Sequence, residues 1–324
     1  MVGLYISLGI VTFILIFVII SIVLARKYKV DFDDHYVPHV FEKYPDCESG
    51  NFWSRKKIHN YTYDENFHYV YGQTVKEKII KFFVTFVVMF LVPVVIFFDG
   101  GSIYKGKRKF RKLRKQFKEG FITVCNHCYM FDILMIRTLD YGHKMFFPMW
   151  KEGAEGPSGT LYRASGGLPI EHTFQGLLNC YREMENVLKR GQHLHVFPEQ
   201  GGWFYYGAVR EFKNGTFRIA YDLNKPIIPL GINFRERTGL FRLLGPKNKP
   251  LVCLSVGDPI YPNKENDKNS EVARLIKEAQ TSVMHLSGIK DEDLNNLIKN
   301  SYKYYKYEPS KSSWTDKKRK YTFD

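Results

Sequence analysis

The chain has 324 residues, and its 48 Lys and Arg against 33 Asp and Glu give a formal net charge of +15. An apolar fraction of 44% and a charged fraction of 25% are those of a folded protein, and they exclude a disordered or collagen-like chain. The positive charge indicates a negatively charged partner, which is nucleic acid, an anionic lipid surface or a phosphorylated substrate. The five Cys are too few for a disulfide framework, and no second pair completes a zinc site with Cys125 and Cys128.

The first predicted element is a transmembrane helix at the N-terminus. Residues 2–25 contain no charged side chain, and as a helix they span about 36 Å, which exceeds a hydrocarbon core of about 30 Å. A secretory signal peptide needs a basic segment before a shorter apolar core, whereas only Met1 precedes this run. We therefore expect a retained membrane anchor over residues 1–25, followed by a linker over residues 26–77.

A second apolar run covers residues 82–98 and is interrupted by Pro93. As a helix it spans about 25 Å, which is short for a membrane crossing, so a crossing and a re-entrant segment both remain open. The basic stretch that follows has nine Lys or Arg between Lys105 and Lys118 and no acidic residue. The positive-inside rule places this stretch, and with it the bulk of the chain, on the cytoplasmic side of the membrane.

The basic stretch also carries a thin apolar stripe, because Phe110, Leu113 and Phe117 recur at spacings of three and four residues. Beside a membrane segment this pattern is typical of an interfacial helix that lies on anionic headgroups. Nucleic-acid binding and a merely solvated helix face are the alternatives; with two membrane segments upstream we favour lipid and expect no nucleic-acid partner. We assign residues 78–118 to the second membrane-embedded segment and this interfacial helix.

Residues 119–300 are predicted to form an α/β domain, ahead of a basic tail over residues 301–324. Short β-rich runs alternate with amphipathic helical stretches along this region. The expected strands are 121–125, 144–150 (a strand or a loop), 193–199, 226–234 and 251–260, and the expected helices are 131–142, 173–191, 215–224 and 269–288. This alternation favours a mostly parallel sheet covered by helices, whose chemistry sits at the carboxyl ends of the strands.

A candidate catalytic pair follows the first of these strands. His127 lies at the carboxyl end of strand 121–125, and Asp132 lies in the first turn of the next helix. This spacing lets the carboxylate reach one imidazole nitrogen while the other accepts a proton from a hydroxyl, which is the arrangement of a general base oriented by an acid. No Ser is suitably placed for a covalent relay, so the substrate's own hydroxyl is the expected nucleophile. A buried His with a hydrogen-bonded carboxylate is the purely structural alternative.

Four sequence blocks in a fixed order surround this pair. They are Asn126-His127-x-x-x-x-Asp132, Gly166 to His172, Phe197 to Gly202 with Phe212-Lys213-Asn214-Gly215 downstream, and Lys225 to Pro229. On these blocks the chain resembles the glycerolipid acyltransferase family, which includes the 1-acyl-glycerol-3-phosphate acyltransferases. The resemblance covers about residues 120–260 and implies a glycerolipid-acyltransferase-like fold, preceded here by N-terminal membrane helices.

The resemblance implies transfer of a fatty acyl group from an activated donor to a lysolipid hydroxyl. His127 would act as the general base and Asp132 would orient it, while Glu199 and Gly201 would lie in the acceptor pocket. Backbone amides near Gly201 would stabilise the tetrahedral oxyanion. The other residues expected to bind substrate are Asn126, His172, Arg210 and Lys213. Neither a metal nor a resident cofactor is implied, and acyl-CoA, acyl carrier protein or acyl phosphate is the expected donor.

Two positions depart from the family pattern. The second and third blocks end in Arg in members that bind the acceptor's phosphate, but here they end in His172 and Gly202. Neither residue offers phosphate the bidentate fork of Arg, but Arg210, Lys213 and Arg218 lie just downstream and could substitute, which keeps lysophosphatidate as an acceptor. The stretch at residues 203–206 is instead aromatic, which suits either core packing or a pocket wall that stacks on a sugar, a ring or a cationic headgroup.

The sequence therefore predicts a membrane-bound O-acyltransferase of phospholipid biosynthesis, with its catalytic domain on the cytoplasmic face. The default acceptor is 1-acyl-sn-glycerol-3-phosphate. The expected partners are membrane lipids, as lysolipid acceptor and as anionic headgroups, and an acyl donor carried on CoA or on acyl carrier protein. A different lysolipid or glycolipid acceptor, a non-catalytic lipid-binding protein of the membrane surface, and a hydrolase of lipid esters remain as alternatives.

Overall fold

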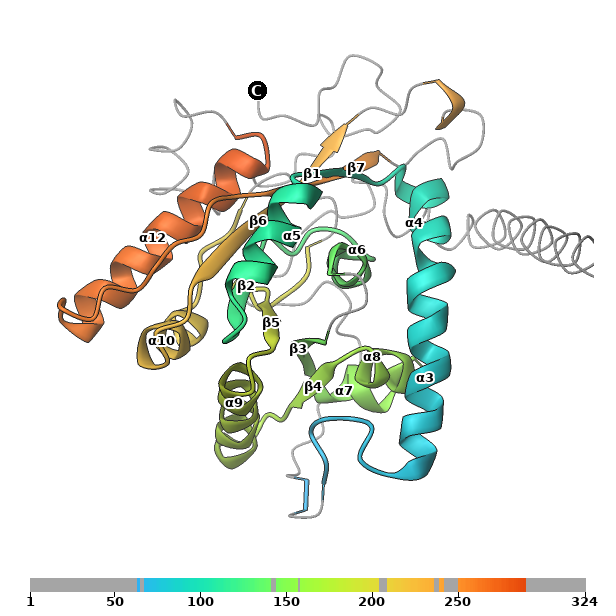
Figure 1. The fold of residues 1–324 in the computed structure, drawn as a ribbon, viewed down its shortest axis with the longest axis horizontal. Helices are drawn as coiled ribbons and strands as arrows, with labels where there is room; N and C mark the ends of the chain where they lie inside the picture. Colours follow the sequence, from blue (N-terminus) through green and yellow to red (C-terminus); the bar gives the residue numbers. More distant parts are fainter. Residues whose placement is uncertain are drawn as a thin grey trace, which may run out of the picture.

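The computed structural model describes residues 63–64, 67–140, 144–156, 158–203, 209–235, 239–241 and 250–289. The predicted anchor over residues 1–25, most of the linker over residues 26–77 and the basic tail over residues 301–324 lie outside these residues. The described part of the chain is an α/β fold built on one seven-stranded sheet (Figure 1).

The sheet confirms the predicted fold class, because every strand pair is parallel except β6 with β7. Its strand order is β1-β7-β6-β2-β5-β3-β4. The strands are β1 (Ile103–Lys105), β2 (Phe121–Cys125), β3 (Met145–Trp150), β4 (Gly167–Ile170), β5 (His193–Val196), β6 (Ile227–Arg235) and β7 (Leu251–Val256). All five residues of the central strand β2 are buried, which explains why its sequence FITVC shows no alternation of apolar and polar residues.

Helices cover both faces of this sheet. They are α3 (Val75–Phe90), α4 (Val92–Gly100), α5 (Lys107–Gln116), α6 (Asp132–Leu139), α7 (Lys151–Glu155), α8 (Gly159–Ala164), α9 (Phe174–Lys189), α10 (Gly215–Asp222) and α12 (Lys268–Leu286). Buried residues of α4, α5 and α6 form one core cluster with the sheet, and those of α9, α10 and α12 form a second. The four predicted helices correspond to α6, α9, α10 and α12, and the short helices α7 and α8 were not predicted.

The α/β domain begins earlier than the predicted boundary at residue 119. Strand β1 pairs in parallel with β7, with Ile103 opposite Cys253, so β1 belongs to the sheet. Helix α5 packs on the same sheet and buries Phe110 completely, while Leu113 is 8% exposed. The predicted boundary is therefore wrong, because a three-residue edge strand is too short to carry the periodicity that would reveal it.

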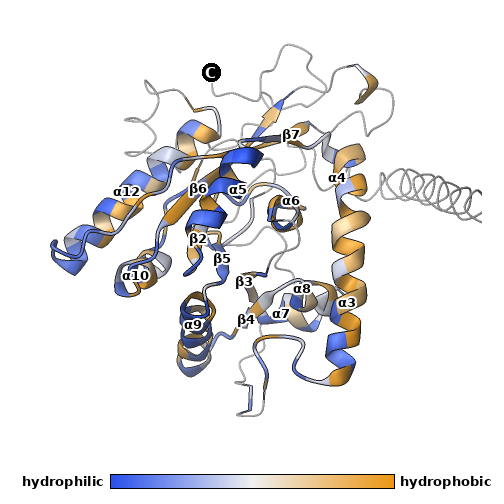
Figure 2. Ribbon diagram, viewed as in Figure 1, coloured by the Kyte–Doolittle hydropathy of each residue, from blue (hydrophilic) through white to orange (hydrophobic). Residues whose placement is uncertain are grey.

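The predicted interfacial role of the apolar stripe on α5 is also wrong. Phe110 and Leu113 face the protein core, and Phe117 packs edge-on against Tyr261 at 6.0 Å between ring centroids. A single narrow apolar stripe fits the face of a sheet as well as the surface of a bilayer, and here it packs on the sheet. Most basic side chains of α5 remain exposed, and the ribbon of α5 is coloured largely hydrophilic in Figure 2.

Helices α3 and α4 run on from one another and form the one described stretch, Val75–Gly100, that is long and apolar enough to cross a membrane. Its most apolar 18-residue window has a mean hydropathy of 2.7, and 11% of that window is buried. The stretch begins at a capping box of Thr74 and Glu77, and it is interrupted at Leu91, just before Pro93 in the first turn of α4. It is longer than the predicted run over residues 82–98 because the charged turns before that run are helical too.

The outer side of α3 and α4 is apolar, as its colouring in Figure 2 shows. The large apolar side chains exposed along this stretch are Val75, Ile79, Phe82, Phe83, Phe86, Phe90 and Phe97. The inner side packs against α6 and α8. The length and composition of this stretch are consistent with membrane association, and both a crossing and a re-entrant arrangement stay open.

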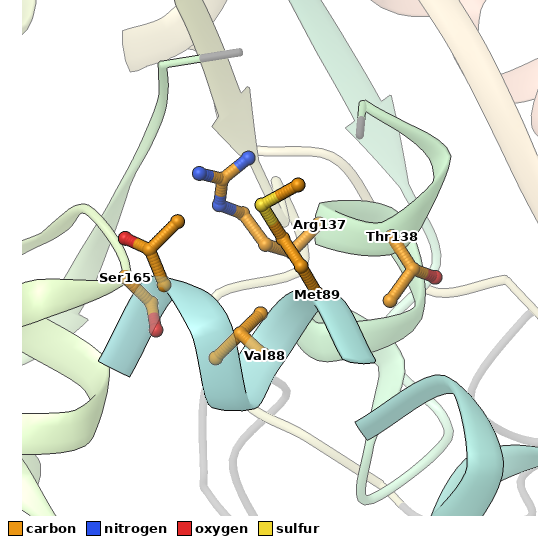
Figure 3. Close-up of a pocket in the computed structure, with 6 residues that line it drawn as sticks. Val88, Met89, Arg137, Thr138 and Ser165 are labelled. Atoms are coloured by element: carbon orange, nitrogen blue, oxygen red, sulfur yellow. The ribbon is translucent and has the colours of Figure 1, made fainter. Parts of the chain in front are cut away.

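A small cavity lies under α3, between this helix, α6 and the end of α8 (Figure 3). Arg137, Thr138 and Ser165 line it together with Val88 and Met89 of α3. The hydroxyls of Thr138 and Ser165 donate to backbone carbonyls of their own helices, each at 2.7 Å. The cavity has room for about one water molecule and contains none of the predicted site residues.

Candidate active site

The predicted catalytic pair forms a short hydrogen bond at the carboxyl end of β2. Nδ1 of His127 lies 2.6 Å from Oδ2 of Asp132, and Oδ1 of Asp132 accepts the backbone N–H of Ile133 at 2.7 Å. Asp132 is the first residue of α6 and is 1% exposed, so the helix N-terminus stabilises its negative charge. An ionised carboxylate only accepts hydrogen bonds, so Nδ1 of His127 carries the proton and Nε2 presents a lone pair.

Two neighbours fix the plane of the His127 ring. The ring of Phe197 stacks on it with 4.1 Å between centroids and 12° between planes. Gly202 lies at the Nε2 edge, where a Cβ atom would be 3.1 Å from Nε2. A side chain at position 202 would crowd the nitrogen that has to meet a substrate, which is a physical reason for Gly in place of the family's Arg. The N–H of Gly202 has no hydrogen-bond acceptor in the part of the chain that the structure describes.

Asn126 has a different role from the predicted contact with substrate. Its side-chain amide pairs with the backbone of β6, donating to the carbonyl of Ile232 at 2.9 Å and accepting the N–H of Ile232 at 2.8 Å. Asn126 is 2% exposed, and its Nδ2 also lies 3.2 Å from Sγ of Cys128. Because both ends of the amide are occupied inside the protein, Asn126 fixes the start of the His127 turn against the neighbouring strand.

Glu199 and Arg210 form a buried ion pair beside this turn. Nη2 of Arg210 lies 2.9 Å from Oε2 of Glu199, and the two residues are 3% and 2% exposed. Glu199 also accepts the backbone N–H of Arg210 at 3.0 Å and that of His127 at 3.3 Å. Glu199 is thus brought to the site as predicted, but its carboxylate ties the segment after β5 to the catalytic turn.

The Arg210 guanidinium is also held by the protein itself. It donates to the carbonyl of Gly201 and lies 4.3 Å from the ring of Trp203, which is 1% exposed. The prediction that Arg210 replaces a missing phosphate ligand is therefore wrong, because the guanidinium is buried and its charge is already paired with the Glu199 carboxylate. Trp203 packs in the interior, and the remaining predicted aromatic residues, 204–206, lie outside the described residues.

The backbone at Gly201 differs in detail from the predicted oxyanion donor. The N–H of Gly201 donates to the carbonyl of Glu199 at 2.8 Å, so this amide is already used inside the turn. The preceding residue, Gln200, has φ 65°, which is the left-handed region that favours Gly. Among the described residues, the amide of this turn that has no acceptor belongs to Gly202, one residue beyond the predicted position.

His172 lies at the carboxyl end of β4 and is paired with an acid. Nε2 of His172 lies 2.8 Å from Oε1 of Glu152, and its ring stacks on Trp150 with 5.0 Å between centroids. The strand order places β5 and β3 between β2 and β4, so His172 is three strands from the His127 strand. At about 4.8 Å per strand this is roughly 14 Å across the sheet.

The other predicted substrate ligand, Lys213, lies at the surface. Its ammonium forms an ion pair with Oε2 of Glu211 at 3.2 Å, and the two side chains are 37% and 60% exposed. Its backbone N–H donates to the carbonyl of Pro198 at 3.0 Å, so the main chain rather than the charge connects Lys213 to the segment after β5.

Three residues of this region were not predicted from the sequence to belong to the site. Phe197 and Gly202 bound the His127 ring, and both lie inside the third sequence block, which was the available signal. Lys151 directly follows β3, is fully buried and lies 4.3 Å over the ring of Tyr63. Its position after a strand of a parallel sheet was a signal, but its partner ring is 88 residues away in the chain.

The thiols beside the site are not activated nucleophiles. Burial raises the pKa of Cys125 and of Cys128 well above the usual range, and the nearby Asp132 and Glu199 carboxylates add to this effect. Both thiols therefore stay protonated at neutral pH. Within the described ranges, no group of three or more His, Cys, Asp or Glu side chains is arranged to hold a metal ion.

Comparison with known proteins gives a family match for the central part of the chain. Residues 102–233 match the family model described as Acyltransferase, a range that contains His127, Asp132, Glu199, Gly202 and Arg210. Among solved structures, the chain is similar to the crystal structure of the 1-acyl-sn-glycerophosphate (LPA) acyltransferase, PlsC, from Thermotoga maritima. That similarity has 22% sequence identity and a TM-score of 0.46, and it covers 84% of this chain and 95% of that chain. No curated protein sequence matches the chain. The match over residues 102–233 supports the resemblance inferred from the four sequence blocks, and this part of the chain is an acyltransferase domain.

Proposed function

We propose that the protein is a membrane-bound O-acyltransferase that moves a fatty acyl group from an activated donor to the hydroxyl of a lysoglycerolipid. The default acceptor is 1-acyl-sn-glycerol-3-phosphate, which would become phosphatidate. The observation that carries this proposal is the hydrogen-bonded His127–Asp132 pair, whose Nε2 edge lies against Gly202 within the acyltransferase domain.

In the proposed mechanism His127 is the general base. Nε2 takes the proton of the acceptor hydroxyl while its oxygen attacks the acyl carbonyl of the donor, and Asp132 stabilises the imidazolium that forms. The C–O bond forms as the carbonyl π bond opens to an oxyanion, to which the N–H of Gly202 would donate. When the oxyanion collapses, the bond to the donor's leaving group breaks and His127 returns the proton to that group.

This chemistry needs no metal and no resident cofactor, because both the proton transfer and the leaving group come from the two substrates and His127. The donor is an activated acyl group on CoA, on acyl carrier protein or on phosphate. The buried and protonated Cys125 and Cys128 argue against an acyl-thiol intermediate on the enzyme and favour direct attack by the acceptor.

Membrane binding is proposed for the helical stretch Val75–Gly100. Its exposed Phe side chains would be buried among lipid chains, whereas its inner side packs on the catalytic domain. The basic α5 follows directly, so the positive-inside rule favours a catalytic domain on the cytoplasmic face with anionic headgroups beside α5.

An acceptor without a phosphate is the second candidate function. The two positions that carry phosphate-binding Arg in relatives hold His172, which is paired with Glu152, and Gly202, which lies against His127. Arg210, the nearest substitute in sequence, is tied to Glu199. A neutral lysolipid or a glycolipid would suit this charge distribution better than a phosphomonoester does.

The test is an acyl-transfer assay with the full chain in lipid vesicles. Labelled acyl-CoA, acyl carrier protein and acyl phosphate are each offered with lysophosphatidate, a neutral monoacylglycerol, a glycosylated monoacylglycerol and lysophosphatidylcholine. The proposal expects a diacyl product from at least one acceptor. Release of free fatty acid alone would identify a hydrolase instead, and the absence of both products would support a non-catalytic lipid-binding protein.

A further inference from the structure

A chain of buried polar side chains runs beneath the His127 turn and has no part in the mechanism above. It begins at Asp140, whose Oδ1 accepts from Nη1 of Arg114 at 3.2 Å and whose Oδ2 lies 2.7 Å from Nδ1 of His193. Oγ1 of Thr123 lies 2.7 Å both from Nε2 of His193 and from Nδ1 of His195. The exposed fractions of Asp140, Thr123, His193 and His195 lie between 0% and 3%.

The Thr123 hydroxyl determines the orientation of both imidazoles. It has one proton, so it donates to one ring and accepts from the other. Asp140 is ionised, because His193 and Arg114 outweigh the effect of burial and lower its pKa to about 2, so Nδ1 of His193 carries a proton. If His193 is neutral, Thr123 donates to it and accepts from His195; if His193 is charged, both directions reverse. In either case one hydroxyl sets the tautomer of His195.

His195 has this hydrogen bond alone within the described part of the chain. Its Nε2 is buried and has no partner there, and burial lowers its pKa well below the usual range, so the ring stays neutral. The register of the sheet places Thr123 directly opposite His195 on the adjacent strands β2 and β5. Thr123 is therefore the group that holds the His195 ring in its orientation.

The orientation of His195 reaches His127 through one aromatic ring. His195 meets Phe197 edge to face, with 4.5 Å between centroids and 84° between planes. Phe197 in turn stacks on His127 at 4.1 Å. Asp132 holds Nδ1 of His127, and the face of Phe197 stacks on the imidazole, so the orientation of Phe197 affects the plane of the ring and the position of Nε2 beside Gly202.

We propose that Thr123 and His195 are positioning residues for the catalytic His127, acting through Phe197, an inference that rests on the proposed acyl transfer. The buried chain from Asp140 to His195 is the support that fixes the orientation of Phe197. A purely structural network would stabilise the fold and leave the reactivity of His127 unchanged. The two roles differ in what happens to turnover when the Thr123 hydroxyl is removed and the domain still folds.

The experiment compares Thr123→Val, which keeps the shape of the side chain and removes the hydroxyl, with Thr123→Ser, which keeps the hydroxyl. We expect kcat of the Val variant to fall about tenfold or more, since ångström-scale misplacement of a catalytic group costs up to about 100-fold, with KM within about twofold. The Ser variant should retain most of the wild-type kcat. His195→Phe, which keeps an aromatic ring but cannot bond to Thr123, should behave as the Val variant does and serves where the Val variant does not fold.

A second readout is independent of acyl transfer. Diethyl pyrocarbonate modifies unprotonated imidazole, and peptide mapping gives the rate at His127 itself. A changed rate at His127 in the Val variant, with a wild-type rate in the Ser variant, supports the positioning role. Equal kcat and equal modification rates in folded Val and Ser variants would overturn it. If wild-type protein acylates no acceptor, the proposed function fails, and the modification rates still decide this inference.

Discussion

Two regions of the carboxyl edge of the sheet differ in what they keep of the family pattern. The end of β2 and β5 holds His127, Asp132 and Glu199, and its geometry agrees with the first and third sequence blocks. The end of β3 and β4 holds His172 paired with Glu152, where relatives carry an Arg. Under the proposed function, the proton-transfer pair is kept, while the position that holds a phosphate-binding Arg in relatives has changed to His172.

The two regions are also held in different ways. At the β2–β5 end Asp132 and Glu199 form hydrogen bonds with His127, and the Nε2 edge of His127 lies against Gly202. At the β3–β4 end Glu171 accepts the backbone N–H of Tyr63 at 2.5 Å and the hydroxyl of Tyr69. This end is thus supported by the segment just before α3.

The largest expected effect comes from breaking the buried ion pair of the β2–β5 end. Arg210→Met leaves the Glu199 carboxylate buried without its cation, which costs about 3–5 kcal/mol of unfolding free energy. Thermal unfolding should show this as a midpoint lowered by about 10 °C. The double variant Glu199→Gln/Arg210→Met should recover part of this loss, and a double variant as unstable as the sum of the two single ones would contradict the pairing.

A substitution at Gly202 should affect catalysis more than folding. In Gly202→Ala the new Cβ lies 3.1 Å from Nε2 of His127, so the ring or the loop must shift, and kcat should fall about 100-fold. Gly153→Ala is the matched control, because its Cβ meets only the flexible end of Met149 at 3.2 Å. Equal activities of these two variants would show that the Gly202 contact does not matter.

A change at the β3–β4 end should alter the choice of acceptor. The double variant Glu152→Gln/His172→Arg places a guanidinium at the family position and removes the carboxylate that would compete for it. We expect kcat/KM for lysophosphatidate, relative to a neutral monoacylglycerol, to rise about tenfold, in line with one charge-assisted hydrogen bond. An unchanged ratio would mean that this end of the sheet does not contact the acceptor headgroup.

The smallest effect is expected for Gln200→Gly. Gln200 has φ 65°, a conformation that costs a side chain about 1–2 kcal/mol, while Gly loses about 0.5–1 kcal/mol more backbone entropy on folding. The net gain in unfolding free energy should therefore lie between about 0 and 1.5 kcal/mol, measured by denaturant titration. A clear loss of stability would mean that the Gln side chain makes contacts which outweigh its backbone strain.

The sequence predicted most of the sheet because its central strands are buried on both faces and are bounded by Gly, Pro and Asn. It missed the short strands β1 and β4, which have three and four residues, and the helices α7 and α8, which lack an apolar period. It misread α5 because a narrow apolar stripe packs equally well on a sheet and on lipid. A pattern of apolar residues predicts the structure where only one environment can bury those residues, and it is ambiguous where both a sheet and a lipid surface can.

The site residues also differ in how far their partners lie along the chain. The spacing of His127 and Asp132 lies within one turn, so their contact was predictable from the chain alone. The partners of Asn126 and His172 are Ile232 and Glu152, 106 and 20 residues away, and only the folded sheet brings them together. Residues whose role depends on such distant partners were assigned to the substrate by resemblance, and the fold reassigns Asn126 and Arg210 to support of the catalytic turn.

The most direct measurement is the rate of acyl transfer by His127→Ala in vesicles, with the acceptor that the wild-type protein uses best. The account predicts a fall of about 10²–10⁴-fold, because the general base is removed, with an unchanged midpoint of thermal unfolding. His285→Ala, on the exposed last turn of α12, should keep the wild-type rate. Full acyl transfer by a folded His127→Ala variant would contradict the central claim that this imidazole activates the acceptor hydroxyl.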